Sequence, residues 1–278
     1  MRGSIRTDLA CEREGGARRG EYRLHGCRVC EITECRSGDC VRYTTVQFSQ
    51  EGTDGEQKDQ APACAVAQVL ANTAARVVPQ PRCVLVACLG NPHITPDSLG
   101  PCTARALEVT RHVQLLDGSA FARLGRCALC AVTPGVLGDT GIESAELVRG
   151  AAREVGAELV IAVDALVTDN KDHIGALVQI SDHGLCPGAG VGNRRAAIRA
   201  QSIGCPVISI GMPTAMDCST LLEGTLARAG ICGVGEELER YLASVERYLV
   251  APVEIDRVVS HGGALLASAI GACFGLRG

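Results

Sequence analysis

Four short apolar runs constrain the fold of this 278-residue chain more than any other feature. They are CVLVACLG (83–90), ALCAV (128–132), LVIAVD (159–164) and PVISIG (206–211). Each has the length of a strand and is apolar throughout instead of alternating, which is typical of strands buried on both faces of a parallel sheet. Helix-like stretches separate them, at 96–113, 142–155 and 194–203. The pattern predicts a three-layer α/β/α fold with a mostly parallel sheet.

The segments outside this core complete the predicted topology. Residues 22–48 read as an N-terminal β-hairpin that turns at Arg36-Ser37-Gly38. Further elements are expected as a helix at 61–77, a strand at 175–181, helical residues at 219–249 with a break from Gly230 to Gly235, and a closing helix at 253–274. We expect one α/β domain over residues 9–278, preceded by a short leader, residues 1–8.

Composition excludes several classes of function. The chain has three Phe, four Tyr and no Trp, too few rings for binding nucleic acid by base stacking. Its 27 Lys and Arg against 31 Asp and Glu give a net charge of −4, without the basic stripe that a phosphate backbone requires. No apolar run reaches the roughly 18 residues of a membrane span, and the N-terminus has no signal-peptide character. We expect a cytoplasmic protein that contacts neither membrane nor nucleic acid directly.

Sixteen cysteines are many for this length. Because many lie inside apolar runs and no export signal precedes them, we interpret them as reduced side chains used as small hydrophobes. Cys27 and Cys30, with Cys35 and Cys40, have spacings that could also form a zinc knuckle. The strand-like sequence around them favours the hairpin over that site.

Two aspartates follow the first and third core runs. Ligands of parallel sheets bind beyond the carboxyl ends of the strands, where Asp97 and Asp164 are expected. Asp97 follows Thr95-Pro96, which resembles a helix start that would favour an ionised carboxylate, whereas burial at a strand end would raise the pKa of Asp164. If close together, the two could share a proton and activate water, or bind a metal. Structural roles at a helix start and as a backbone cap are the alternatives.

Other candidates have simpler explanations. Thr140 to Glu143 fits a capping box. GAGVGN (188–193) could cradle an anion, but a tight loop with Asn193 as helix cap is favoured. Asp217 follows the last core run and could be a cap or a third acid. The chain lacks the HExxH and GxSxG motifs and any ligand-spaced pair of histidines, so a zincin or a serine triad is not supported.

The motifs together resemble the bacterial spore (germination) protease family. The segments that carry the resemblance are RTDLACE (6–12), CEITE (30–34), LGNPHITPDSLGP (89–101), VTRH (109–112), TPGVLGDTGIES (133–144), VDAL (163–166), QISDHGLCPGAGVGNRR (179–195) and GCPVISIGMPTAMD (204–217). They keep the family's order, and VEIDRVVSHGGALLASAI (253–270) matches more weakly. The GN…D..G element is also similar to that of hydrogenase-maturation proteases, which share the fold.

The resemblance implies an endopeptidase that begins the degradation of small acid-soluble spore proteins in the spore core during germination. Family members are made as zymogens, trim their own N-terminus and assemble as homotetramers. Their favoured catalytic groups are two aspartates, which correspond to Asp97 and Asp164 here, with no cofactor or metal. We expect Asn91, Asn193 and Asp217 to support the substrate.

The same resemblance gives the N-terminus a function. The family cuts after an acidic residue and before an apolar residue and Ala, with an acid following, and Thr7-Asp8-Leu9-Ala10-Cys11-Glu12 has that form. It predicts cleavage between Asp8 and Leu9.

The chain departs from the family in a short leader, in only about 36 residues (218–253) before the last helix, and in VTDNKDH where a basic stretch is usual after VDAL. A metal-dependent peptidase of the same fold and a non-cutting spore-protein binder remain the alternative hypotheses.

Overall fold

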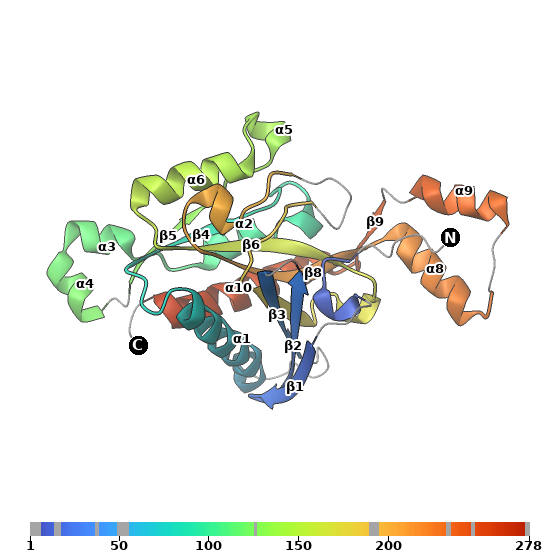
Figure 1. Cartoon of the computed structure of the whole chain (residues 1–278), viewed down its shortest axis with the longest axis horizontal. Coiled ribbons are helices and arrows are strands. Elements are labelled where there is room, and N and C mark those ends of the chain that lie inside the picture. Colours follow the sequence, from blue (N-terminus) through green and yellow to red (C-terminus); the bar gives the residue numbers. More distant parts are fainter. Residues whose placement is uncertain are drawn as a thin grey trace.

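A computed structural model describes residues 7–13, 18–36, 39–48, 56–124, 127–188, 195–231, 235–245 and 248–275 (Figure 1). Within them the strands form one nine-stranded sheet, in the order β1-β2-β3-β7-β8-β6-β4-β5, with β9 added beside β8. The strands are β1 Arg18–Leu24, β2 Cys27–Arg36, β3 Asp39–Gln47, β4 Cys83–Cys88, β5 Ala128–Val132, β6 Leu159–Thr168, β7 Leu177–Ser181, β8 Val207–Asp217 and β9 Leu249–Val250.

The sheet has a parallel half and an antiparallel half that meet at β8. Strands β5, β4, β6 and β8 pair in parallel, as their uniformly apolar sequences predict. On the other side of β8, strands β7, β3, β2 and β1 are antiparallel. The predicted hairpin is therefore β2 and β3 of the main sheet, joined to it through β7, and β1 is an additional strand. The α/β fold class is confirmed.

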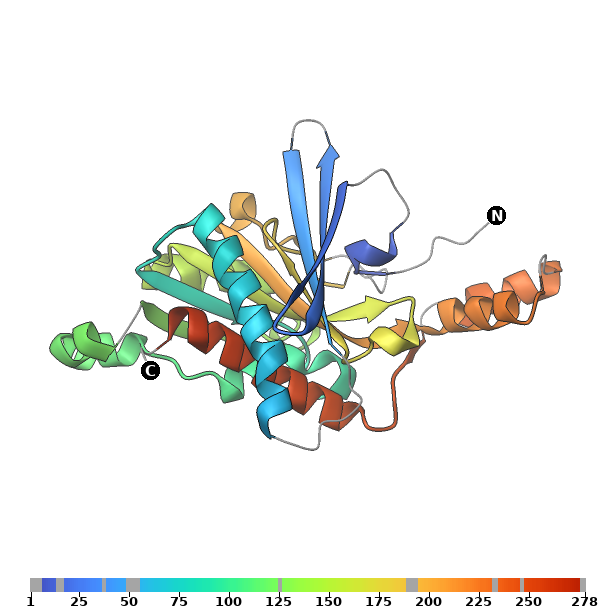
Figure 2. The same ribbon diagram turned by 90° about the horizontal axis from the view of Figure 1, so that it is seen from below.

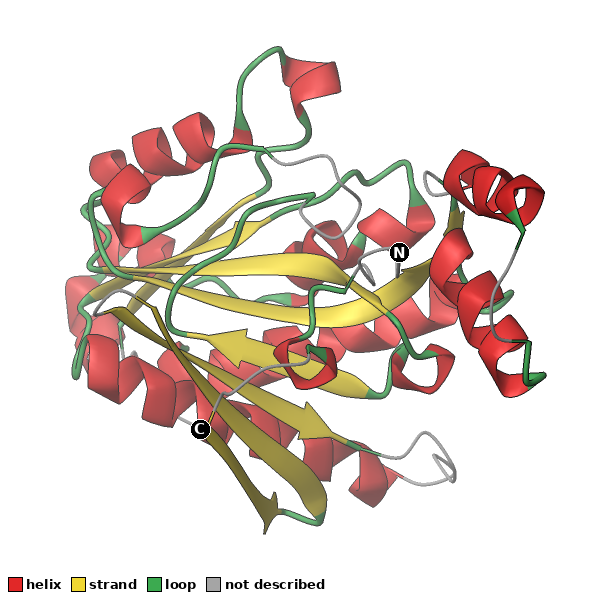
Figure 3. Cartoon of the chain, turned by 45° about the vertical axis from the view of Figure 1, so that its right-hand side comes forward, coloured by secondary structure: helices red, strands yellow, loops and turns green. Residues whose placement is uncertain are grey.

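Helices cover both faces of the sheet (Figures 2 and 3). The helical elements are η1 Ala10–Glu12, α1 Glu56–Val77, η2 Thr95–Asp97, α2 Leu99–Ala106, α3 Arg111–Leu116, α4 Gly118–Leu124, α5 Leu137–Thr140, α6 Ser144–Val155, η3 Lys171–His173, α7 Ala200–Ile203, α8 Cys218–Arg228, α9 Glu236–Val245 and α10 Ile255–Phe274. Strand β4 shows how both faces are filled: Val84 and Val86 pack with α1, α2 and α10, whereas Leu85 and Ala87 pack with α6 and α7.

Helix α10 is long and apolar enough to cross a membrane by length and composition alone, with a mean hydropathy of 1.2. Half of that stretch is buried inside the protein, where Leu266 and Ile270 are fully enclosed. A core helix passes the same test, and α10 packs against α1 and α2 as a core helix.

Several predicted helix boundaries were wrong. The helix expected over 96–113 is divided into η2, α2 and α3. The one expected over 194–203 is only α7, because residues 195–199 are not helical and Ile198 forms a β-bridge with Leu185. The predicted capping box begins three residues too early: α6 is capped by Glu143, whose N–H donates to Glu146 Oε2 at 3.3 Å. Thr140 instead ends α5.

The cysteines of the hairpin do not form a zinc knuckle. Cys35 and Cys40 face each other across β2 and β3 and form a disulfide, which differs from the expectation of reduced thiols. Cys27 is buried under the sheet with Val29, whereas Cys30, an odd number of residues further along β2, points to the opposite face. Four thiolates on these positions cannot surround one ion.

Candidate functional site

Asp164 lies at the point where β6 extends beyond the end of its parallel neighbour β4. The last residue of β4, Cys88, pairs with Val163, so Asp164 is the first residue of β6 beyond that pairing. The prediction that the strand ends at Asp164 was wrong, since β6 continues to Thr168 along β8. Asp164 therefore has a strand on one side, and on the other the loop that follows β4.

Asp97 is carried by that loop. The N–H of Asn91 donates to Asp97 Oδ2 at 2.8 Å, and the Thr214 hydroxyl of β8 donates to the Pro96 carbonyl at 2.6 Å. Gly90 has a φ of +112°, and a Cβ there would lie 1.9 Å from the Asp97 carbonyl oxygen. Only glycine allows the loop to fold this closely. The loop thus fixes Asp97 beside the end of β6.

Burial shifts the pKa of both carboxyl groups, and neighbouring negative charges act on that of Asp164 as well. Burial raises the pKa of Asp97, and the hydrogen bond from the Asn91 N–H only partly opposes it. Burial also raises the pKa of Asp164 well above its usual range, with further contributions from the negative charges of Asp97 and Asp8. The dipole at a helix start does not keep Asp97 at the low pKa that the sequence suggested. The arrangement favours one proton shared between neighbouring acids, which is the condition for general acid and base chemistry.

The N-terminal segment Thr7–Arg13 occupies the same end of β6. The Asp8 N–H donates to the Val167 carbonyl at 2.9 Å, and the Val167 N–H donates to Asp8 Oδ2 at 2.9 Å. Leu9 and Ala10 have 0% and 1% of their surface exposed. Because Asp8 also raises the pKa of Asp164, the segment passes within electrostatic reach of the acid pair. The sequence-predicted Asp8, Leu9, Asp97 and Asp164 are thus brought to one place.

Glu12 is a second point at which the N-terminal segment is bound to the rest of the protein. Its carboxylate, only 4% exposed, accepts hydrogen bonds from the hydroxyls of Thr7 and Thr168 and from the Asp169 N–H. His173 Nδ1 lies 2.5 Å from Glu12 Oε1. Burial alone would raise the pKa of Glu12, but these hydrogen bonds, that of His173 above all, lower it. The bond to Glu12 in turn raises the pKa of His173. Both shifts favour the charged forms, so Glu12 and His173 favour an ion pair.

The remaining predicted residues lie apart from the acid pair or have local roles. The side chain of Asn91 accepts from the His93 N–H at 2.9 Å and so shapes its own loop. Asp217 caps α8, accepting from the Ser219 N–H at 2.9 Å. It is six residues along β8 from Gly211, the partner of Asp164, or about 20 Å of strand. Asn193 lies outside the described residues.

Sequence reasoning missed three groups that the fold brings to the site. Thr214 positions the Asp97 loop, His173 meets Glu12, and Gln179 of β7 binds the backbone of the N-terminal segment. Gln179 and Thr214 stand in segments that carry the family resemblance, but those segments do not say which side chains meet the acid pair. That depends on the strand order, in which β7 pairs with β8 and β8 with β6.

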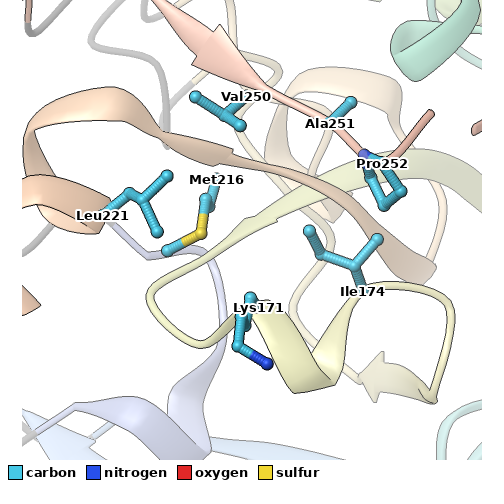
Figure 4. Close-up of a pocket in the computed structure, with 7 residues that line it drawn as sticks. All are labelled: Lys171, Ile174, Met216, Leu221, Val250, Ala251 and Pro252. Atoms are coloured by element: carbon cyan, nitrogen blue, oxygen red, sulfur yellow. The ribbon is translucent and has the colours of Figure 1, made fainter. Parts of the chain in front are cut away.

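An open pocket of about 320 Å³ lies on another side of η3 (Figure 4). It is lined by Lys171, Ile174, Met216, Leu221, Val250, Ala251 and Pro252, which are mostly apolar. Neither Asp97 nor Asp164 lines it. Within the described residues, no cluster of three or more His, Cys, Asp or Glu side chains is arranged to hold a metal ion.

Comparison with known proteins identifies the family of this chain. A germination protease of Clostridium perfringens is 30% identical, with 82% of this chain and 76% of the relative covered. One from Caldanaerobacter subterraneus is 42% identical over 58% of this chain, but over only half of its own length. Among solved structures, a NiFe hydrogenase maturation protease of Thermococcus kodakarensis matches with a TM-score of 0.36 and 16% identity, covering 73% of this chain and 98% of that one. Residues 28–239 match the family described as germination protease. The chain belongs to the germination protease family, a family of peptidases.

Proposed function

We propose that this chain is an endopeptidase of the spore core that begins the degradation of small acid-soluble spore proteins at germination. It cleaves after Glu or Asp, and it is made as a zymogen that cuts its own chain between Asp8 and Leu9. Asp97 and Asp164 activate the water, without a metal or cofactor.

One observation carries the proposal: the predicted cleavage sequence is bound along β6 within electrostatic reach of Asp164. Asp8 is bonded to Val167, three residues along β6 from Asp164, and Leu9 is fully buried. Polar N-terminal segments are usually loose, because few contacts repay the entropy of ordering them. A buried Leu9, next to an Asp8 whose charge acts on Asp164, supports reading this segment as a peptide bound for cleavage.

The raised pKa values support a division of labour between Asp97 and Asp164. One carboxylate takes a proton from water, which attacks the carbonyl carbon of the residue before the cleaved bond. The other, still protonated, gives its proton to the departing amine. Burial raises the pKa of both groups, and the negative charges of Asp97 and Asp8 raise that of Asp164 further, so Asp164 is the better candidate for the protonated acid.

The arm formed by α8, α9 and β9 supports assembly into a homotetramer. It projects from the body of the protein (Figures 1 and 2). It exposes large apolar side chains, namely Tyr241, Tyr248 and Leu249. Exposed apolar surface of this kind marks a protein–protein contact. Light scattering of the purified chain measures the oligomer directly, and a monomer at micromolar concentration would contradict this part of the proposal.

The deciding experiment mixes the purified chain with a small acid-soluble spore protein and follows the products by mass spectrometry. We expect cuts after Glu or Asp, and a new N-terminus at Leu9 on the enzyme. Retained cutting in the presence of EDTA is expected, and inhibition that added metal restores would favour a metal-dependent peptidase. Binding of the spore protein without any cut, by a folded chain, would make the protein a non-catalytic binder.

A further inference from the structure

Gln179 brackets the bond that we propose is cut. Its Nε2 donates to the carbonyl oxygen of Asp8 at 3.1 Å, and its Oε1 accepts from the Ala10 N–H at 2.7 Å. The carboxamide thus binds the backbone on both sides of Leu9. Because the Ala10 N–H can only donate, the carboxamide oxygen must face Ala10 and the NH₂ group must face Asp8.

The bound segment and the strand around it hold the Gln179 side chain, so its donor already points at the Asp8 carbonyl before the bond is cut. Gln179 is 8% exposed and lies in the middle of β7, between the fully packed Val178 and Ile180. A buried donor with a fixed direction stabilises charge more than a mobile one, since no reorientation is needed when the charge appears.

The strand register places Gln179 opposite the acids. Gly211 of β8 pairs with Asp164 of β6 on one side and with Gln179 of β7 on the other. Side chains in directly paired positions point to the same face, so Asp164 and Gln179 face the same space with roughly 10 Å between their Cα atoms. Gly211 contributes no side chain between them, and a Cβ there would lie 2.5 Å from the Asp164 carbonyl oxygen.

We propose that Gln179 is a further catalytic residue, which binds the carbonyl oxygen of the residue before the cleaved bond and stabilises the negative charge formed there. The inference rests on the proposed function, because it needs the Asp8–Leu9 bond to be a substrate. The same amide would bind the equivalent carbonyl of a substrate protein once the N-terminal segment has left.

The reaction step balances as follows. A carboxylate of the acid pair removes a proton from water, and the water oxygen forms a bond to the Asp8 carbonyl carbon. The electron pair of the C=O bond moves to the oxygen, which the Gln179 N–H holds. When the C–N bond breaks, the electron pair on the oxygen re-forms the C=O bond of the new carboxyl group. The protonated acid gives its proton to the Leu9 nitrogen.

A second donor to the Asp8 carbonyl belongs to the segment itself. Arg13 donates from its guanidinium at 3.2 Å, in an exposed position. Water competes with that contact, and Arg13 belongs to the segment that is cut and not to the rest of the enzyme. Gln179 is the donor that the enzyme brings to every substrate.

The test uses the full chain and compares Gln179→Glu with Gln179→Leu. The glutamate keeps the acceptor for the Ala10 N–H but replaces the donor with an acidic oxygen, whereas leucine removes both groups without adding a charge. Gln68→Glu is the matched control, because Gln68 undergoes the same chemical change on the exposed face of α1. Asp164→Asn reports on the proposed function itself. Thermal melts establish that each variant is folded.

Two rates are measured at neutral pH by mass spectrometry: appearance of the Leu9 N-terminus, and cleavage of a synthetic peptide with the sequence of residues 4–16 by processed enzyme. We expect both Gln179 variants to slow the first rate about 10²- to 10³-fold, the usual effect of removing one such donor, and Gln68→Glu to match the wild type. Gln179→Glu should lower kcat for the peptide while KM stays within about threefold.

The outcomes separate the inference from the function. A Gln179→Glu variant that cuts within about threefold of the wild type, while Asp164→Asn is inactive, overturns the role of Gln179 and leaves the peptidase intact. A higher KM with unchanged kcat gives Gln179 a binding role only and also overturns the proposal. If the folded wild type cuts neither its own chain nor the peptide, the proposed function fails, and the inference with it.

Discussion

The two halves of the sheet that meet at β8 contribute different kinds of groups to the site. The parallel half supplies acids: Asp164 on β6 and Asp97 in the loop after β4. The antiparallel half supplies the neutral amide of Gln179 from the middle of β7. Parallel strands bring their carboxyl ends to one edge, so acids from separate strands converge there. In the antiparallel strand β7, it is the middle of the strand that lies at this edge. A buried side chain there can bind a peptide.

The largest expected effect is in the parallel half. Asp164→Asn removes the more strongly perturbed acid of the pair, and we expect self-cleavage to fall at least about 10³-fold, the scale of lost acid–base catalysis. Mass spectrometry of the N-terminus over time measures it. A folded Asp164→Asn variant that still matures at the wild-type rate would remove this residue from the mechanism.

The same variant has a stability signature that depends on pH. The folded-state pKa of Asp164 is raised, so its contribution to stability is fully present below the unfolded pKa and is lost as pH rises through the folded value. Asparagine carries no such loss. We therefore expect the Tm of Asp164→Asn minus that of the wild type to increase from pH 4 to pH 8, and a difference that is flat or falls with pH would contradict the assigned shift.

The next largest effect is expected at Glu12, which binds the N-terminal segment away from Asp97 and Asp164. Glu12→Gln keeps the size of the side chain but loses the charge that His173 and the Thr168 hydroxyl bind. Hydrogen bonds to buried charges contribute about 1.5–3 kcal/mol, so we expect self-cleavage to slow roughly ten- to a hundredfold. Glu31→Gln, an exposed position on β2, is the control. Equal rates for the two variants would show that Glu12 does not position the cleaved bond.

A smaller effect is expected where β8 supports the Asp97 loop. Thr214→Val removes the hydroxyl that donates to the Pro96 carbonyl while keeping the shape of the side chain. We expect a decrease in Tm of about 2–4 °C for the loss of one buried hydrogen bond, and a decrease of a few-fold in cleavage rate. A melt unchanged within a degree would mean that the loop is fixed without this contact.

The smallest effect should come from the far end of the antiparallel half. The Cys35–Cys40 disulfide lies at the β2–β3 turn, away from the acid pair. Cys35→Ser with Cys40→Ser should leave the rate of Leu9 formation within about twofold of the wild type. A large loss of rate would mean that the β2–β3 hairpin also helps to position the N-terminal segment.

The sequence predicts the parallel half much better than the antiparallel half. CVLVACLG and LVIAVD identify their strands because burial on both faces leaves an unmistakable apolar run, and the acids that follow them are found by position alone. Gln179 could not be found this way. Its role depends on β7 pairing with β8 at Gly211, a contact between strands that no periodicity records. The disulfide was missed for another reason: the predicted hairpin sets Cys35 and Cys40 on either side of its turn, but the sequence analysis interprets the cysteines as reduced.

Burial of Leu9 and Glu12 has a consequence for kinetics. A cut after Asp8 leaves Leu9–Arg13 covalently joined to β1, so the freed end remains a tethered competitor for the site it has just left. Its effective concentration is on the order of millimolar for a short tether, above that of most substrates in solution. Turnover of a substrate protein would then begin with a lag set by departure of this end, and substitutions that loosen Glu12 would shorten the lag even as they slow the first cut.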